Sequence, residues 1–130
     1  MVDVSAVQDS QVLFLQVGKI LRTCPRSCGH HARLIQNLLA VSARKNLALN
    51  RKLGYLTLPT TREKALAYLS DESRRQGSGT FSIPFDRQEL ADYLSVDRSA
   101  LSAVLGALRR EGLISFQKNQ FTLHRQEDLR

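Results

Sequence analysis

Residues 86–114 read DRQELADYLSVDRSALSAVLGALRREGLI and contain two short amphipathic stretches separated by a break at residues 95–97. Asp86 is followed three residues later by Glu89, which is the pattern of a helix capping box, and Asp97 is a plausible cap for the second stretch. Apolar residues in that second stretch recur at helical spacing: Leu101, Val104, Leu105 and Leu108. The sequence therefore predicts two helices joined by a tight turn, the second with an outward face of small and polar side chains.

The segments on either side of this pair predict a larger unit. Residues 60–63 form another capping pattern and predict a helix that runs to about Gln76. Residues 80–85 alternate and predict a short edge strand, because Pro84 has no N–H to donate to a ladder. Residues 113–124 predict a small hairpin. The order of helix, edge strand, helix–turn–helix and hairpin is that of a winged helix-turn-helix.

The first 56 residues predict a different kind of structure. Residues 5–17 end in the β-prone run QVLFLQV and predict one strand, which cannot form a sheet alone. It must pair with another chain, or most of its sheet is missing from this polypeptide. Residues 30–56 contain no Pro and predict a helix of roughly 40 Å at 1.5 Å per residue. The expected fold is mainly α with small β: a remnant strand and a long dimerisation helix in residues 1–56, then a winged helix-turn-helix domain in residues 57–130.

Leucines recur on more than one side of the long helix and need a surface to pack against. A second copy of the chain is the simplest candidate. Asn46 and Asn50 lie one turn apart, where they either fix the register of a dimer or face solvent. The expected dimerisation residues are Leu38, Ser42, Asn46, Leu49, Asn50 and Leu53.

The charge of the chain favours a polyanionic partner. The net charge is +7 and the pI is about 10.0. Lys and Arg outnumber Asp and Glu by eight to two in residues 1–56, but only by eleven to ten in residues 57–130. The preference for nucleic acid over an acidic membrane therefore depends on the helix pattern more than on total charge. No apolar run is long enough to span a bilayer, so we expect a cytoplasmic protein without membrane contact.

The predicted second helix has side chains suited to reading DNA. The planar fork of Arg98 matches O6 and N7 of guanine, and the Ala103 methyl group matches that of thymine. Arg98 could instead form a salt bridge on a solvated surface, and Lys118 could serve only to solubilise its turn. The expected DNA-binding residues are Arg87, Gln88, Arg98, Ser99, Ser102, Ala103 and Lys118.

From residue 5 onward the chain resembles the C-terminal part of a Crp/Fnr transcription regulator. AVQDSQVLFL resembles the last strand of the family's effector-binding β-roll, and residues 30–56 resemble its long dimerisation helix. TTREKALAYL and RQELADYLSVDRSALSAVLGALRREGLI resemble its DNA-binding domain. The resemblance implies a homodimer on a near-palindromic stretch of double-stranded DNA, with RNA polymerase as a possible further partner.

The chain departs from the family pattern in two places. The phosphate-holding cassette of the β-roll is absent, so we expect no cofactor and no binding of cyclic AMP. The family's usual base-reading trio of Arg, Glu and Arg corresponds here to Arg98, Ser99 and Ala103. One of three is retained, which implies a different operator or weaker selectivity. An alternative function follows: a truncated regulator that pairs with a full-length relative and binds DNA weakly or not at all.

Two cysteines and two histidines near the long helix are weak candidates for metal ligands. Cys24 and Cys28 have a C-x3-C spacing rather than the C-x2-C of zinc knuckles, and there is no second pair. His30 and His31 follow directly. We expect a structural cysteine and solvated histidines rather than a metal site. No nucleophile motif, paired carboxylates or phosphate-binding glycine loop indicates an enzyme, so no catalytic residue is predicted.

Overall fold

The computed structural model of the chain describes residues 3–20 and 29–124. The chain divides into two units, residues 1–45 and 46–130, and each is described by itself. Within the described ranges, none of the helices combines the length and the apolar character that a membrane crossing needs. The domain boundary expected after residue 56 stays a prediction.

Most of the described residues of the first unit are exposed. Residues 3–16 form neither helix nor strand, and helix α1 (Val17–Ile20) follows them. The strand predicted within residues 5–17 is therefore wrong for this chain by itself. A strand needs a neighbour to satisfy its backbone N–H and C=O groups, and these residues pair with none of the described segments. Helix α2 (Gly29–Leu56) begins in this unit and continues into the second, close to the predicted bounds.

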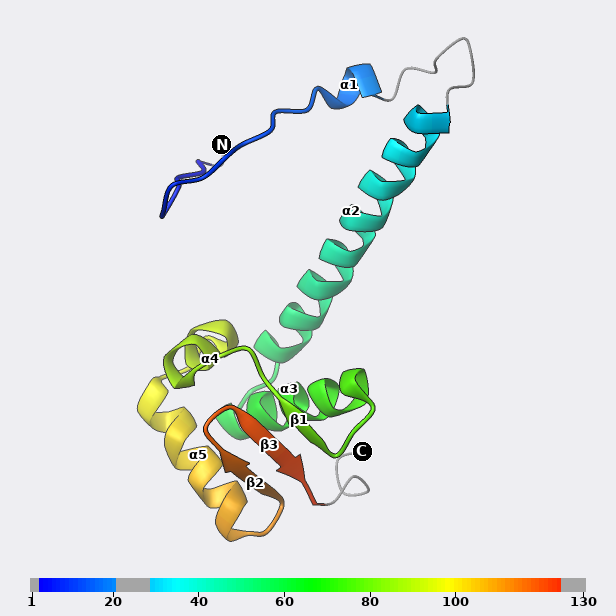
Figure 1. Ribbon diagram of the computed structural model, residues 1–130. Coiled ribbons are helices and arrows are strands. Elements are labelled where there is room, and N and C mark those ends of the chain that lie inside the picture. Colours follow the sequence, from blue (N-terminus) through cyan, green and yellow to red (C-terminus); the bar gives the residue numbers. More distant parts are fainter. Residues whose placement is uncertain (1–2, 21–28, 125–130) are drawn as a thin grey trace. The chain divides into compact units, whose positions relative to one another are not determined.

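The second unit has the predicted winged helix-turn-helix order (Figure 1). After the end of α2 it contains α3 (Thr61–Gln76), β1 (Thr80–Ser82), α4 (Arg87–Leu94), α5 (Arg98–Arg110), β2 (Ile114–Gln117) and β3 (Gln120–Leu123). The mainly α fold with a small sheet is confirmed.

The helix ends in this unit form where the local sequence predicts them. At α3, the Thr60 hydroxyl accepts from the Glu63 amide at 3.2 Å, and the Glu63 carboxylate accepts from the Thr60 amide at 3.2 Å. This reciprocal pair satisfies two amides that the first helical turn leaves without partners. Gly77 ends α3 with a φ of 65°, a left-handed conformation that glycine adopts without a steric cost.

The small sheet has the strand order β1–β3–β2, with both pairs antiparallel. Strand β3 is therefore central, and β1 is an edge strand as predicted. Phe81 of β1 lies opposite Phe121 of β3, and the two rings stack with centroids 6.3 Å apart. The sheet packs against α3 and α5, and the fully buried core includes Leu69, Leu90, Leu94, Leu101, Leu105, Leu108, Ile114 and Phe121.

Tyr55 attaches the last turn of α2 to this core. Its hydroxyl donates to the Asp71 carboxylate of α3 at 2.7 Å, and its ring meets Tyr68 edge to face at 5.8 Å. Burial and the neighbouring Asp71 carboxylate raise the pKa of Tyr55, so the phenol keeps its proton and remains a donor. The end of the long helix is thereby fixed against α3.

Candidate nucleic-acid interface

Helices α4 and α5 are held at a fixed turn by their caps. At α4, the Asp86 carboxylate accepts from the Glu89 amide at 2.8 Å, and the Glu89 carboxylate accepts from the Asp86 amide at 2.8 Å. The helix ends at Ser95, whose φ of 51° is left-handed. Asp97 then caps α5 by accepting from the backbone amides of Ser99 and Ala100. Both predicted caps are confirmed.

Helix α5 buries one face and exposes the other. Leu101, Leu105 and Leu108 are at most 1% exposed, and each packs into the core. On the other side, Ser99, Ser102 and Ala103 are exposed. The face that could touch a partner is therefore outside the folded unit, which a DNA-reading helix requires.

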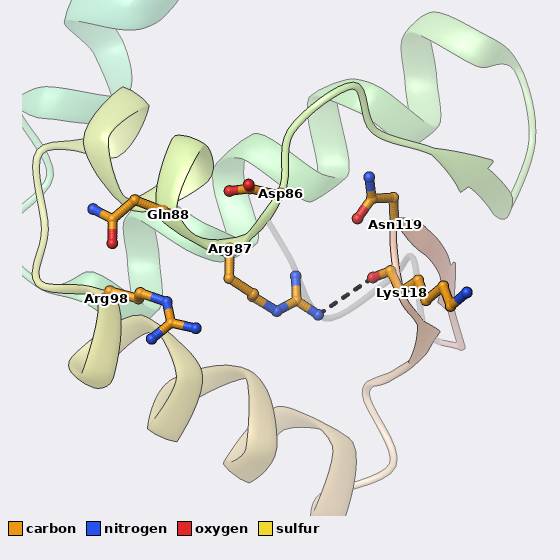
Figure 2. Close-up of a pocket in the computed structure, with 6 residues that line it drawn as sticks. All are labelled: Asp86, Arg87, Gln88, Arg98, Lys118 and Asn119. Atoms are coloured by element: carbon orange, nitrogen blue, oxygen red, sulfur yellow. Dashed lines mark hydrogen bonds between the residues drawn. The ribbon is translucent and has the colours of Figure 1, made fainter.

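A hollow of ≈ 600 Å³ lies between the start of α4, the start of α5 and the turn of the β2–β3 hairpin (Figure 2). Three cationic side chains contribute to it, against the single carboxylate of Asp86, which is engaged in its cap. The lining residues are Asp86, Arg87, Gln88, Arg98, Lys118 and Asn119. Four of the seven predicted DNA-binding residues therefore meet at one place, and the other three lie along the exposed face of α5.

Arg98 is exposed at the first position of α5. The ion pairs among the described residues join Arg62 to Glu111, Arg74 to Asp71 and Arg75 to Glu72, and none involves Arg98. Its guanidinium is thus not occupied by a carboxylate in this part of the chain, and it extends toward the hollow in Figure 2.

Arg87 is tied to the hairpin rather than projecting into solvent. Its guanidinium carbon lies 4.7 Å from the Phe116 ring centroid and 5.2 Å from that of Phe121. One guanidinium nitrogen donates to the Lys118 carbonyl oxygen at 3.5 Å, as Figure 2 shows. Burial lowers the pKa of Arg87 from its ordinary value, but the group stays charged. These contacts fix the hairpin against α4.

Arg109 and Phe116 belong to the same cluster and were not among the predicted residues. The guanidinium of Arg109 lies 5.0 Å from the Phe116 ring, so Phe116 is contacted by arginines from both helices. Helical periodicity could not show this contact, because it depends on where the hairpin folds back.

The turn of the hairpin presents Lys118. Gln117 pairs with Gln120, so Lys118 and Asn119 form a two-residue loop. Lys118 has a φ of 53°, in the left-handed region that non-glycine residues seldom adopt. Glycine or asparagine would suit this backbone better than lysine. Its ammonium group is exposed.

The Ser99 side chain is engaged within its own turn. Its hydroxyl donates to the same Asp97 carboxylate oxygen that accepts from the Ser99 amide at 2.8 Å and the Ala100 amide at 3.0 Å. These bonds, first that from the Ser99 hydroxyl, hold the pKa of Asp97 below its usual range. Gln88 donates similarly to Asp92 at 2.9 Å.

The expected dimerisation residues lie along α2. Leu38 is partly buried, whereas Ser42, Asn46, Leu49, Asn50 and Leu53 are exposed. The Asn50 side-chain amide donates to the Asn46 side-chain oxygen at 2.9 Å. The two amides therefore act as a pair on the helix surface.

The candidate metal ligands are not brought together in the described part of the chain. His30 is exposed and His31 partly buried, both in the first turn of α2. Cys24 and Cys28 lie outside the described residues. Over residues 3–20 and 29–124, no group of three or more His, Cys, Asp or Glu side chains could hold a metal ion.

Comparison with known proteins agrees with this geometry. Residues 63–130 match the family model described as a Crp-like helix-turn-helix domain. The chain is 33% identical over 92 residues to the probable transcriptional regulator flp of Lacticaseibacillus casei, covering 71% of this chain and 42% of that protein. It is 31% identical over 91 residues to the transcriptional activator protein FnrL of Cereibacter sphaeroides, covering 63% of this chain and 37% of that protein.

A solved structure has the same fold. FixK2 from Bradyrhizobium japonicum matches with a TM-score of 0.65 at 23% identity, covering 75% of this chain and 50% of that one. The chain thus spans half or less of the length of these relatives. The family match, the fold and the two regulators give one conclusion: this chain belongs to the Crp/Fnr family of transcription regulators and contains the family's helix-turn-helix DNA-binding domain.

Proposed function

We propose that the chain binds specific double-stranded DNA as a homodimer on a near-palindromic operator. The main support is the exposed polar face of α5, which begins beside a hollow lined by three cations. An α-helix fits the major groove of B-DNA, and residues near its N-terminus reach the base edges. Arg98 reads guanine, and Ser99, Ser102 and Ala103 complete the reading face.

The residues around the hollow hold the sugar-phosphate backbone. Lys118 at the hairpin turn and Gln88 at the start of α4 line the same hollow as Arg98. Phosphate contacts from such residues fix the register of a protein on DNA. Arg87 contributes charge and keeps the hairpin in place. Backbone contacts of this kind release counterions, so affinity falls steeply as salt rises.

Dimerisation through α2 is supported by a seven-residue repeat along that helix. The repeat includes four of the expected residues, Ser42, Asn46, Leu49 and Leu53, but not Leu38 and Asn50. Leu39, Asn46 and Leu53 recur at intervals of seven, and Ser42, Leu49 and Leu56 form a second series offset by three. Alternating offsets of three and four are the pattern of a coiled-coil seam, and a single Asn in one series fixes register. Leu39, Leu49 and Leu53 are 64%, 62% and 57% exposed in the single chain. Burial of these side chains against a partner chain would stabilise a dimer.

A footprint on DNA tests this proposal. Sites are first selected from random duplexes, and the protected bases are then mapped. We expect two protected half-sites about 34 Å apart, one helical turn, related by two-fold symmetry. Sedimentation of the free protein should give twice the 14.6 kDa chain mass. A monomer, or protection without symmetry, would contradict the homodimer on a palindrome.

A second candidate function is a modulator that pairs with a longer relative and binds DNA weakly. It is favoured by the exposed leucines of α2 and by the retention of Arg98 alone from the family's base-reading trio. Salt separates the two proposals: DNA binding has a steep log–log salt slope, whereas pairing through leucines depends far less on salt. Competition between this chain and a relative for dimer formation would support the second.

Two finer expectations are implied by the family alone. RNA polymerase would be a partner at promoters, and the chain would work in the cytoplasm with the DNA. The partnership with RNA polymerase is tested by gel retardation. The mobility of a promoter fragment with both proteins bound is compared with its mobility when each protein is bound separately.

A further inference from the structure

Ser99 and Ser102 present hydroxyl groups on the same exposed face of α5, but the two are in different hydrogen-bonding states. The Ser99 hydroxyl is bonded to the Asp97 carboxylate. No hydrogen bond joins the Ser102 hydroxyl to any residue of the described ranges. One turn of helix thus displays one engaged hydroxyl and one that is open.

The direction of the Ser99 bond follows from its partner. A serine hydroxyl has one proton and two acceptor lone pairs, whereas an ionised carboxylate can only accept. The pKa of Asp97 is held below its usual range, so the group is ionised at neutral pH. The two backbone amides that Asp97 also caps keep its carboxylate at this place. The proton of Ser99 is therefore committed to Asp97, and only lone pairs remain for an outside partner.

We propose that Ser99 reads DNA as an acceptor only and selects a base that offers an amino group, adenine or cytosine, on the strand that it contacts. This inference rests on the proposed DNA-binding function. In the major groove, adenine offers its N6 amine and cytosine its N4 amine, whereas guanine and thymine offer only acceptors in those places. Two acceptors cannot bond to one another, so a guanine or thymine opposite Ser99 is rejected.

Ser102 provides a comparison within the same helix. Its hydroxyl is free to rotate, so it donates to a keto oxygen or accepts from an amine equally well. The position that Ser102 contacts should therefore tolerate all four bases. The selectivity comes from the Asp97 bond and not from the presence of a serine.

The bond itself can be tested without DNA. The pKa of the Asp97 carboxylate is measured by carbon NMR in the protein and in the variants Ser99→Ala and Ser102→Ala. We expect Ser99→Ala to raise this pKa toward that of an ordinary aspartate and Ser102→Ala to leave it unchanged. An unchanged pKa in Ser99→Ala would mean that the hydroxyl does not donate to Asp97, and would overturn the inference.

The base preference is then tested with duplexes that carry each of the four bases at every half-site position. The position where Ser99→Ala alters affinity identifies the contacted base. There, the unaltered protein should bind adenine or cytosine about two- to tenfold better than guanine or thymine, the effect of one hydrogen bond. Ser99→Ala should remove this preference. Glycine is also a favourable N-cap residue, so Asp97→Gly should keep the helix start while it removes the partner of the Ser99 hydroxyl. This variant should bind guanine or thymine at that position as well as adenine or cytosine.

The outcomes separate this inference from the function on which it rests. Specific binding with a preference for guanine or thymine at the Ser99 position would overturn the inference alone. A preference that persists in Asp97→Gly would also overturn it. A protein with no sequence-specific binding at all would overturn the proposed function, and the inference with it.

Discussion

The winged helix-turn-helix buries its large apolar side chains, whereas the residues that precede it expose theirs. Among the described residues, every large hydrophobic side chain that is exposed precedes Gly54, and every buried one follows it. Phe14 is 91% exposed, whereas Phe121 is completely buried. The second region therefore packs on its own, while the first has apolar surface that only another surface can cover. Stability should reside in one region and association in the other.

The largest effect should come from a cavity in the packed region. Leu105 is 1% exposed on the inner face of α5. Leu105→Ala removes buried apolar volume and should lower the free energy of unfolding by about 2–5 kcal/mol, measured by urea denaturation. A loss below about 1 kcal/mol would mean that the winged helix-turn-helix is not tightly packed, and the contrast with the preceding residues would not hold.

Next comes the long helix, where two leucines of similar exposure provide a matched pair. Leu49 lies in the proposed seam and Leu47 does not, although they are 62% and 57% exposed. Leu49→Asp places two like charges in an apolar interface and should weaken the dimer more than tenfold, or by about 1.4 kcal/mol or more. Leu47→Asp should change little. Sedimentation equilibrium measures both, and equal effects would exclude this seam.

Arg87 tests whether the hairpin is held by stacking or by charge alone. Arg87→Lys keeps the charge but loses the planar group over Phe116 and Phe121, so this exchange is not conservative. We expect a loss of about 1 kcal/mol in stability and faster hydrogen exchange in β2 and β3. Arg110→Lys, at an exposed position of the same domain, is the control. Unchanged exchange in Arg87→Lys would show that the stack does not hold the hairpin.

The features that sequence predicts well are those decided within a few residues. The caps at Thr60, Asp86 and Asp97 and the apolar stripe of α5 depend only on neighbouring side chains, and all of them form as expected. The strand in residues 5–17 was predicted from β propensity, but a strand also needs a partner. Propensity does not supply one.

The sequence predicts where the candidate site residues lie on the helices, but not the contacts that these residues make. Helical spacing predicts Ser99, Ser102 and Ala103 on one outward face of the helix that Arg98 begins, and all four residues are exposed. That Arg87 lies on two aromatic rings depends on the fold-back of the hairpin, about thirty residues later. That the Ser99 hydroxyl donates a hydrogen bond to Asp97 depends on the geometry of one cap. Neither can be read from the pattern of residue types.

The smallest expected effect is the dependence of stability on pH through Asp97. The pKa of Asp97 is lowered in the folded chain, chiefly by the Ser99 hydroxyl, so its ionised form contributes stability above its ordinary pKa of 3.8. That contribution is lost as pH falls through the lower folded-state value. The melting temperature of Asp97→Asn should thus be lower than that of the unaltered protein at pH 6. The difference between the two melting temperatures should be smaller at pH 3. A difference in melting temperature that does not change with pH would contradict this sign.

Arg98 begins α5 and is the best single position at which to test whether the outward face of this helix reads DNA sequence. Affinities of the unaltered protein and Arg98→Ala are measured for a selected operator and for a scrambled duplex at the same salt concentration. Loss of a good guanine contact, about 1–3 kcal/mol, should weaken operator binding about 5- to 150-fold for each half-site and scrambled binding far less. Equal losses of affinity on the two duplexes, or no loss on either, would mean that Arg98 does not read DNA sequence.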